Sequence, residues 1–80
     1  MDALKKAEAK VVGTKQVLRA LKSGSVSRVY VANDTDTFLF QRVIGAAEAA
    51  HAPVVRIATM KELGLACGVE VPTAAAAIVR

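Results

Sequence analysis

The spacing of apolar residues divides the chain into alternating helical and extended segments. Apolar side chains recur every three or four positions in residues 14–23 and 37–50, which is typical of helices with one buried face. Residues 26–32 are rich in β-branched and aromatic side chains, which indicates a central strand buried on both sides. Glycine and proline interrupt the pattern between these segments. The chain is therefore predicted to alternate strands with helices.

The same pattern defines the remaining elements. Helices are predicted over residues 3–10, 14–23, 37–50 and 60–67, and strands over residues 11–12, 26–32, 54–58 and 74–79. The last segment is rich in alanine, so periodicity alone also allows a helix there. Alternation of this kind favours one sheet with helices on both faces. We expect an α/β fold, a single-domain α-β-α sandwich over residues 1–80 with a central four-stranded mixed sheet and four helices.

Composition narrows the class of protein. The 80 residues are 54% hydrophobic and 22% charged, which suits a small folded domain and not a disordered chain. The longest apolar run is too short to cross a bilayer, and the first ten residues lack the apolar core of a signal peptide. The single cysteine excludes an internal disulfide. These features predict a cytoplasmic protein that contacts no membrane.

No residue pattern indicates catalysis. The only histidine, His51, stands at a predicted helix end with no nucleophile placed beside it, and Cys67 lies in an apolar helix without a second metal ligand. Asp34 and Asp36 precede a helix, where carboxylates usually act as caps and not as metal ligands. The sequence contains neither a Walker pattern nor GxGxxG. We therefore expect a protein that is not an enzyme and that holds no cofactor and no metal.

Positive charge is concentrated in the first third of the chain. The formal net charge is +4, but residues 1–28 contain seven basic and two acidic side chains, whereas the remainder contains four basic and five acidic ones. This distribution suits an anionic partner such as a nucleic acid. A solvated basic helix face that maintains solubility fits equally well. Charge alone leaves both interpretations open.

The segment from Gly13 to Arg19 combines this charge with the start of a helix. Gly13 and Thr14 offer a hinge and an N-cap hydroxyl, which would place Lys15 and Gln16 in the first turn. Free backbone N–H groups and the helix dipole favour negative partners there. At about 100° per residue, one face of this helix carries all its long polar side chains. They are Lys15, Gln16, Arg19 and Lys22, with Ser23 beside them.

A second candidate site is the loop from Gly68 to Pro72. Two valines, Val69 and Val71, flank Glu70 between a glycine that ends a helix and a proline. Apolar side chains in such a loop are expected to lie at least partly on the surface. They either fold back onto the core or form an apolar surface for an unstacked nucleotide base.

Taken together, these segments resemble the L7Ae/L30e family of ribosomal and ribonucleoprotein proteins, and most of all its small bacterial YbxF-like members. The resemblance covers almost the whole chain, through GTKQVLRALKSG (13–24), VYVANDTD (29–36) and MKELGLACGVEVPTAAAAI (60–78). The motif LG-x-A-C/A-G-x-E-V before an alanine-rich strand is the most specific part. The resemblance implies an α-β-α sandwich that binds kink-turn RNA, a bulged duplex with tandem sheared G·A pairs.

The resemblance also implies roles for individual residues. Many family members have Gly-x-Asn-Glu and then a lysine at the helix start, where they address guanine edges; here the corresponding positions hold Lys15, Gln16 and Arg19. Lysine donates to guanine O6 and N7, and glutamine keeps a carbonyl acceptor. Phosphate contacts are implied for Lys22, Arg28 and Lys61, and a cover over an extruded base for Val69, Glu70 and Val71.

We therefore expect a monomeric, non-enzymatic protein that recognises and stabilises a kink-turn in ribosomal RNA or another structured RNA, with the ribosome as one candidate partner. Regular A-form RNA hides its major groove, so a helix can enter only where the duplex is bulged or kinked. Two alternatives belong to other classes. One is a protein–protein interaction module of the same fold, and the other is an accessory RNA-binding subunit for an RNA-modifying enzyme.

Overall fold

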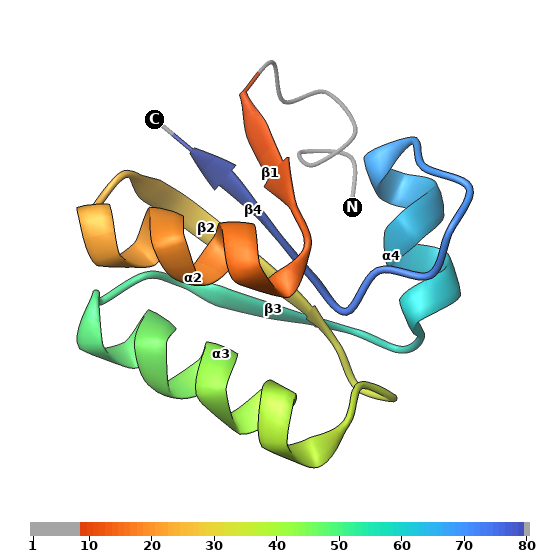
Figure 1. Ribbon diagram of the computed structural model, residues 1–80, viewed down its shortest axis with the longest axis horizontal. Helices are drawn as coiled ribbons and strands as arrows, with labels where there is room; N and C mark the ends of the chain where they lie inside the picture. Colours follow the sequence, from red (N-terminus) through yellow and green to blue (C-terminus); the bar gives the residue numbers. More distant parts are fainter. Residues whose placement is uncertain (1–8, 80) are drawn as a thin grey trace.

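One four-stranded sheet organises the protein (Figure 1). The computed structural model describes residues 9–79. Its elements are β1 (Lys10–Val12), α2 (Thr14–Ser23), β2 (Val26–Ala32), α3 (Thr37–Ala49), β3 (Val54–Ile57), α4 (Met60–Cys67) and β4 (Ala75–Val79). The strand order is β1-β4-β2-β3, in which β4 runs antiparallel to β1 and β2, and β3 runs parallel to β2. The sheet is therefore mixed, as predicted.

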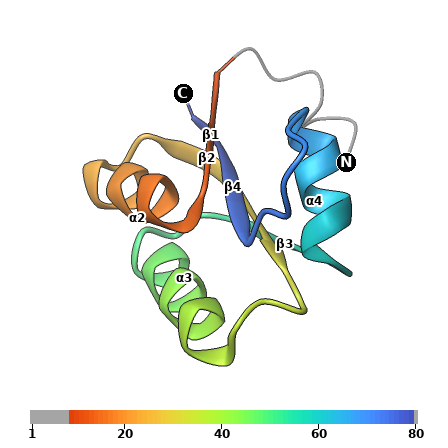
Figure 2. The ribbon, with the colours of Figure 1, turned by 45° about the vertical axis from the view of Figure 1, so that its right-hand side comes forward.

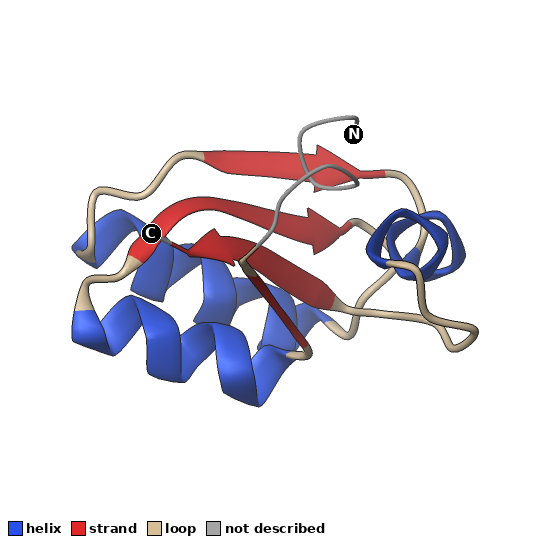
Figure 3. Cartoon of the chain, turned by 90° about the horizontal axis from the view of Figure 1, so that it is seen from above, coloured by secondary structure: helices blue, strands red, loops and turns tan. Residues whose placement is uncertain are grey.

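Helices cover both faces of this sheet, which confirms the predicted sandwich. Figure 2 shows α4 on one side, and Figure 3 shows α2 and α3 side by side on the other. The side chains of β2 alternate between the two layers. Val29 and Val31 belong to the core under α2 and α3, and Tyr30 and Ala32 belong to the core under α4.

Alanine in β4 allows both helical layers to approach the middle of the sheet. Ala75, Ala76 and Ala77 are fully buried, and β4 pairs with strands on both sides. The predicted strand at this end of the chain is therefore confirmed. The central position of β2 is also confirmed, although Ser27 and Arg28 near its start are exposed, so the strand is buried on both sides only from Val29 onward.

Between residues 9 and 79 the structure has three of the four predicted helices, α2, α3 and α4. Residues 3–8 of the predicted first helix lie outside the described residues. Its last residue, Lys10, begins β1 instead, because it pairs with Ile78 of β4. Smaller differences occur at element ends, since α3 and β3 each end one residue early and β4 begins at Ala75.

Both aspartates of the loop after β2 act as helix caps, as predicted. One Asp36 carboxylate oxygen accepts hydrogen bonds from the N–H groups of Phe38 and Leu39, at 3.0 and 3.2 Å, at the start of α3. Asp34 accepts a hydrogen bond from the N–H group of Met60 at 2.8 Å, so it caps α4 and not the helix that follows it in sequence. This contact fixes the loop after β2 against the start of α4.

Candidate functional site

The starts of three helices meet at one edge of the sheet. Strands β1, β2 and β3 run in the same direction, and each is followed by a helix that begins at this edge (Figures 1 and 2). In open α/β sheets, ligand sites form outside the carboxyl ends of strands, and helix N-termini favour anions. We call this region the loop edge and define it as residues 13–16, 33–36, 59–61 and 68–74.

The start of α2 differs from the other two because no side chain in the described part of the chain caps it. Asp36 caps α3, and Thr59 caps α4 by accepting from the N–H group of Glu62 at 3.1 Å. The prediction that the Thr14 hydroxyl caps α2 is wrong. Thr14 is instead the first helical residue, because Gly13 holds the cap position at φ 103° with a backbone conformation that favours glycine. The N–H groups in the first turn of α2 therefore donate to no capping side chain from residues 9–79.

The exposed face of α2 carries the polar side chains that the helical spacing predicted. Lys15, Gln16 and Arg19 are exposed, as is Lys22 in the last turn. On the opposite side, Val17 is fully buried in the core between the helices and the sheet. The helix has no acidic residue, so its outward face presents positive charge along with the uncapped N-terminus.

The segment after α4 holds the loop edge together. Its backbone and its neighbours share four hydrogen bonds: Gly13 N–H to Ala75 O (2.9 Å), Ala32 N–H to Ala74 O (2.9 Å), Thr35 Oγ1 to Ala74 O (3.4 Å) and Thr73 N–H to Met60 O (3.0 Å). These bonds attach the segment to the starts of α2, α3 and α4. The two candidate sites predicted from sequence, the start of α2 and the loop over 68–72, are therefore connected through residues 73–75 at the same edge of the sheet.

The two valines of that loop have different environments. Val69 is half-buried and packs against the core under α4, whereas Val71 is 65% exposed. Glu70 between them is also exposed. With Lys61 and Leu65 of α4, these residues line a hollow of about 240 Å³. Val69 therefore folds back onto the core, whereas Val71 remains on the surface.

Gly64 determines how closely this loop approaches α4. An added Cβ at Gly64 would collide with the carbonyl oxygen of Val71 and would also lie 3.4 Å from the Thr73 hydroxyl. The backbone of the loop therefore packs directly on the helix where the side chain is missing. Gly64 is not among the site residues predicted from the sequence, although a glycine inside a predicted helix is a signal for close packing.

Arg28 lies away from the loop edge. It is on the sheet face opposite α2, where its Nη1 donates to the Tyr30 hydroxyl at 3.4 Å, and Tyr30 packs in the core under α4. Arg28 also pairs with Ile78, far along β4 from the residues that contact Gly13. The structure therefore brings Lys15, Gln16, Lys61 and the 68–72 loop to one edge but does not bring Arg28 to it.

Cys67 and His51, the other titratable residues considered from the sequence, lie in different environments. Burial raises the pKa of the Cys67 thiol, an effect that the positive charge of Lys10 partly opposes. His51 is exposed and has a positive φ of 56° just after α3.

Of the helices described in residues 9–79, none is long and apolar enough to span a bilayer.

Comparisons with known proteins agree with this architecture. The chain is 47% identical over 70 residues to the RNA-binding protein YbxF of Geobacillus stearothermophilus, which covers 88% of this chain and 85% of that protein. It is 46% identical over the same length to an RNA-binding protein of Geobacillus thermodenitrificans. Among solved structures, the Giardia lamblia 15.5kD RNA binding protein superimposes with a TM-score of 0.84 at 31% identity. That match covers 91% of this chain and 62% of the Giardia protein.

The family assignment rests on the whole length of the sequence. The model of the ribosomal protein L7Ae/L30e/S12e/Gadd45 family matches residues 1–80. The Giardia structure superimposes on the arrangement of strands and helices described above. This protein therefore belongs to the ribosomal protein L7Ae/L30e/S12e/Gadd45 family.

Proposed function

We propose that this protein binds structured RNA at a kink-turn and stabilises the kinked form, without enzymatic activity. The observation that carries the proposal is the start of α2, which is uncapped, basic and exposed at the loop edge. Relatives at 46% and 47% identity are described as RNA-binding proteins, which supports RNA as the ligand.

The geometry of α2 suits a duplex that has been opened. A regular A-form helix has a deep, narrow major groove that side chains do not read, and a bulge or kink widens it. The first turn of α2 would enter there, with Lys15 donating to guanine O6 or N7 and Gln16 pairing with a neighbouring base edge. Arg19 and Lys22 continue the positive face toward the other end of the helix, where phosphate contacts are favoured.

The 68–72 loop would close the other side of the same site. Val71 is exposed beside the hollow that Lys61 lines, so an extruded base can rest on the valine while the ammonium group contacts phosphate. The loop is fixed relative to α2 through residues 73–75, which contact Gly13 and Met60. Two contact surfaces held at a fixed separation favour a bent ligand over a straight duplex.

A gel shift with two matched hairpins tests the proposal. One hairpin contains a bulge followed by tandem G·A pairs, and in the other those pairs are replaced by Watson–Crick pairs. We expect the first to bind at least about tenfold more tightly at moderate salt, since base contacts add to the phosphate contacts that both hairpins share.

Equal affinity for the two hairpins would contradict specific recognition. Failure to shift either hairpin, together with a discrete oligomer in light scattering, would favour a protein–protein interaction module of the same fold. Salt concentration must be identical in the two titrations, because phosphate contacts make the affinity strongly salt-dependent.

A further inference from the structure

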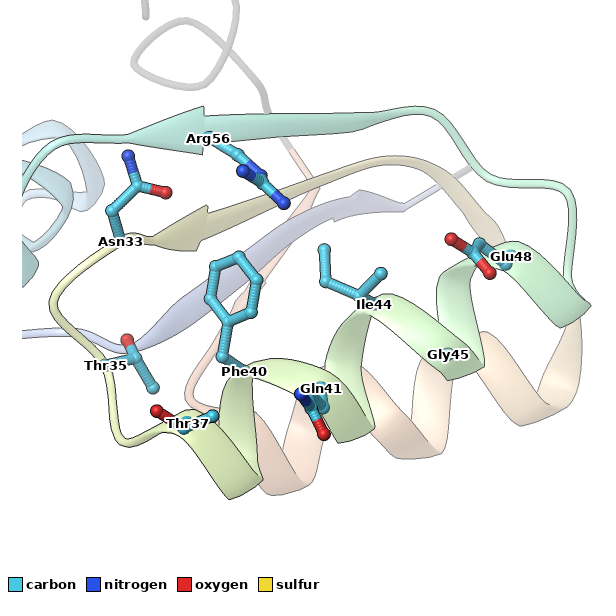
Figure 4. A pocket seen from close by; sticks show the side chains of 9 residues that line it. All are labelled: Asn33, Thr35, Thr37, Phe40, Gln41, Ile44, Gly45, Glu48 and Arg56. Carbon is cyan, nitrogen blue, oxygen red and sulfur yellow. The ribbon is translucent and has the colours of Figure 1, made fainter.

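A hollow lies away from α2, between α3 and β3. It measures about 700 Å³, within the range of small-ligand sites, which is about 300–1,000 Å³. Figure 4 shows that its inner wall consists of Phe40 and Ile44 of α3, with Arg56 of β3 opposite. We refer to this hollow as the α3–β3 trough.

A planar cation and an aromatic ring face each other inside the trough. The guanidinium carbon of Arg56 lies 5.0 Å from the centre of the Phe40 ring. Arg56 is exposed and Phe40 is half-buried, so the outer surface of the pair is accessible from solvent. Guanidinium planes and aromatic rings are the groups on which proteins stack unpaired bases.

The polar side chains that line the trough include neutral amides and a carboxylate. Asn33, at the end of β2, and Gln41, on α3, supply exposed amides that both donate and accept hydrogen bonds. Glu48, near the other end in Figure 4, supplies a carboxylate that accepts from N–H donors and repels phosphate. A base edge that carries N–H donors, such as the N1 and N2 edge of guanine, fits the Glu48 end, and the sugar and phosphate fit the Asn33 end.

The Asn33 end of the trough is continuous with the loop edge. Asn33 and Thr35 line the trough and also belong to the loop after β2. The Thr35 hydroxyl bonds to Ala74, whose neighbour Ala75 accepts from Gly13 at the start of α2. An RNA strand that leaves the loop edge past Asn33 therefore reaches the trough without crossing the sheet.

We propose that the α3–β3 trough binds one unpaired purine nucleotide, with its base against the Arg56–Phe40 pair. The inference rests on the RNA-binding function proposed above for the loop edge. A nucleotide that flanks the bound kink-turn and a free purine nucleotide present the same chemistry to this site. The experiment below distinguishes the two sources.

The test compares a blunt kinked hairpin with two versions that carry an unpaired guanosine extension, one at the 5′ end and one at the 3′ end. We expect one extension to increase the affinity of the wild-type protein about tenfold, a typical contribution of one stacked base. Arg56→Ala should abolish this gain, and Arg56→Lys should lose most of it, because lysine keeps the charge but not the plane. Arg42→Ala is the matched control, because Arg42 is exposed on α3 but does not line the trough.

Affinity for the blunt hairpin should be the same in all four proteins, which separates this site from the proposed function. A second arm titrates guanosine 5′-monophosphate into labelled protein and follows the NMR signals of Gln41 and Arg56. A gain from an extension that depends on Arg56 identifies RNA as the source, and Arg56-dependent shifts with the mononucleotide alone identify the free nucleotide. If neither extension increases affinity and the mononucleotide moves neither signal, the trough proposal is overturned, whatever the blunt hairpin does.

Discussion

Replacement of Lys15 by alanine weakens binding to a kinked hairpin by about 1–3 kcal/mol of binding free energy. It leaves binding to the Watson–Crick control nearly unchanged. The reason is the position of Lys15 in the first turn of α2, exposed beside N–H groups that no side chain caps. An ammonium group there donates to a base edge that only an opened groove presents. Fluorescence anisotropy with both hairpins gives the two dissociation constants.

Lys22→Ala is the matched control for this prediction. Lys22 lies on the same exposed face but in the last turn, away from the loop edge, so it suits phosphate contacts and not base contacts. Its loss should lower the affinity for both hairpins to a similar extent. It should also reduce the slope of log affinity against log salt concentration by the amount expected for about one phosphate contact. If Lys15→Ala lowers the affinity for both hairpins equally, Lys15 does not contact a base edge.

Replacement of Gly64 by alanine destabilises the protein by about 1–3 kcal/mol and displaces the 68–72 loop. The new methyl group would collide with the Val71 carbonyl, which is backbone and cannot turn aside like a side chain. Urea denaturation measures the loss of stability, and binding of the kinked hairpin under conditions where the variant remains folded reports the position of the loop. We expect weaker binding of the kinked hairpin even when the variant is fully folded.

Gly45→Ala, which also places alanine inside a helix, should raise the stability of the protein and not lower it. Gly45 lies inside α3, is exposed, and has nothing within 4 Å of an added Cβ. Alanine there should stabilise the protein by about 0.5–1 kcal/mol, because glycine costs that much in a helix interior. Equal effects of the two substitutions would show that helix propensity, and not the contact with Val71, governs position 64.

Local patterns in the sequence were sufficient to predict most of the fold. The run around Val29 predicted the central strand, and the spacing of Val17 and Leu21 predicted which face of α2 is buried. Asp36 was predicted as a cap because it immediately precedes a helix. Each of these features depends on residues within one turn or one strand, so neighbours in the sequence determine it.

Features that depend on distant residues could not be predicted in the same way. Asp34 caps α4, 26 positions further along, because the parallel strands β2 and β3 end side by side. Gly13 takes the cap position of α2 in a conformation bound to Ala75, which leaves Thr14 inside the helix. Arg28 falls on the face of the sheet opposite α2, a placement set by the register of β2 and β4.

If the loop edge holds RNA in a kinked form, binding of the protein must shorten the distance between the two arms of the hairpin. Donor and acceptor dyes on the two arms report that distance by energy transfer, in a buffer without divalent cations where phosphate repulsion keeps the arms apart. We expect added protein to raise the transfer efficiency of the hairpin with G·A pairs and to leave that of the Watson–Crick control unchanged. Unchanged transfer in the first hairpin at saturating protein, or an equal rise in both, would contradict this expectation.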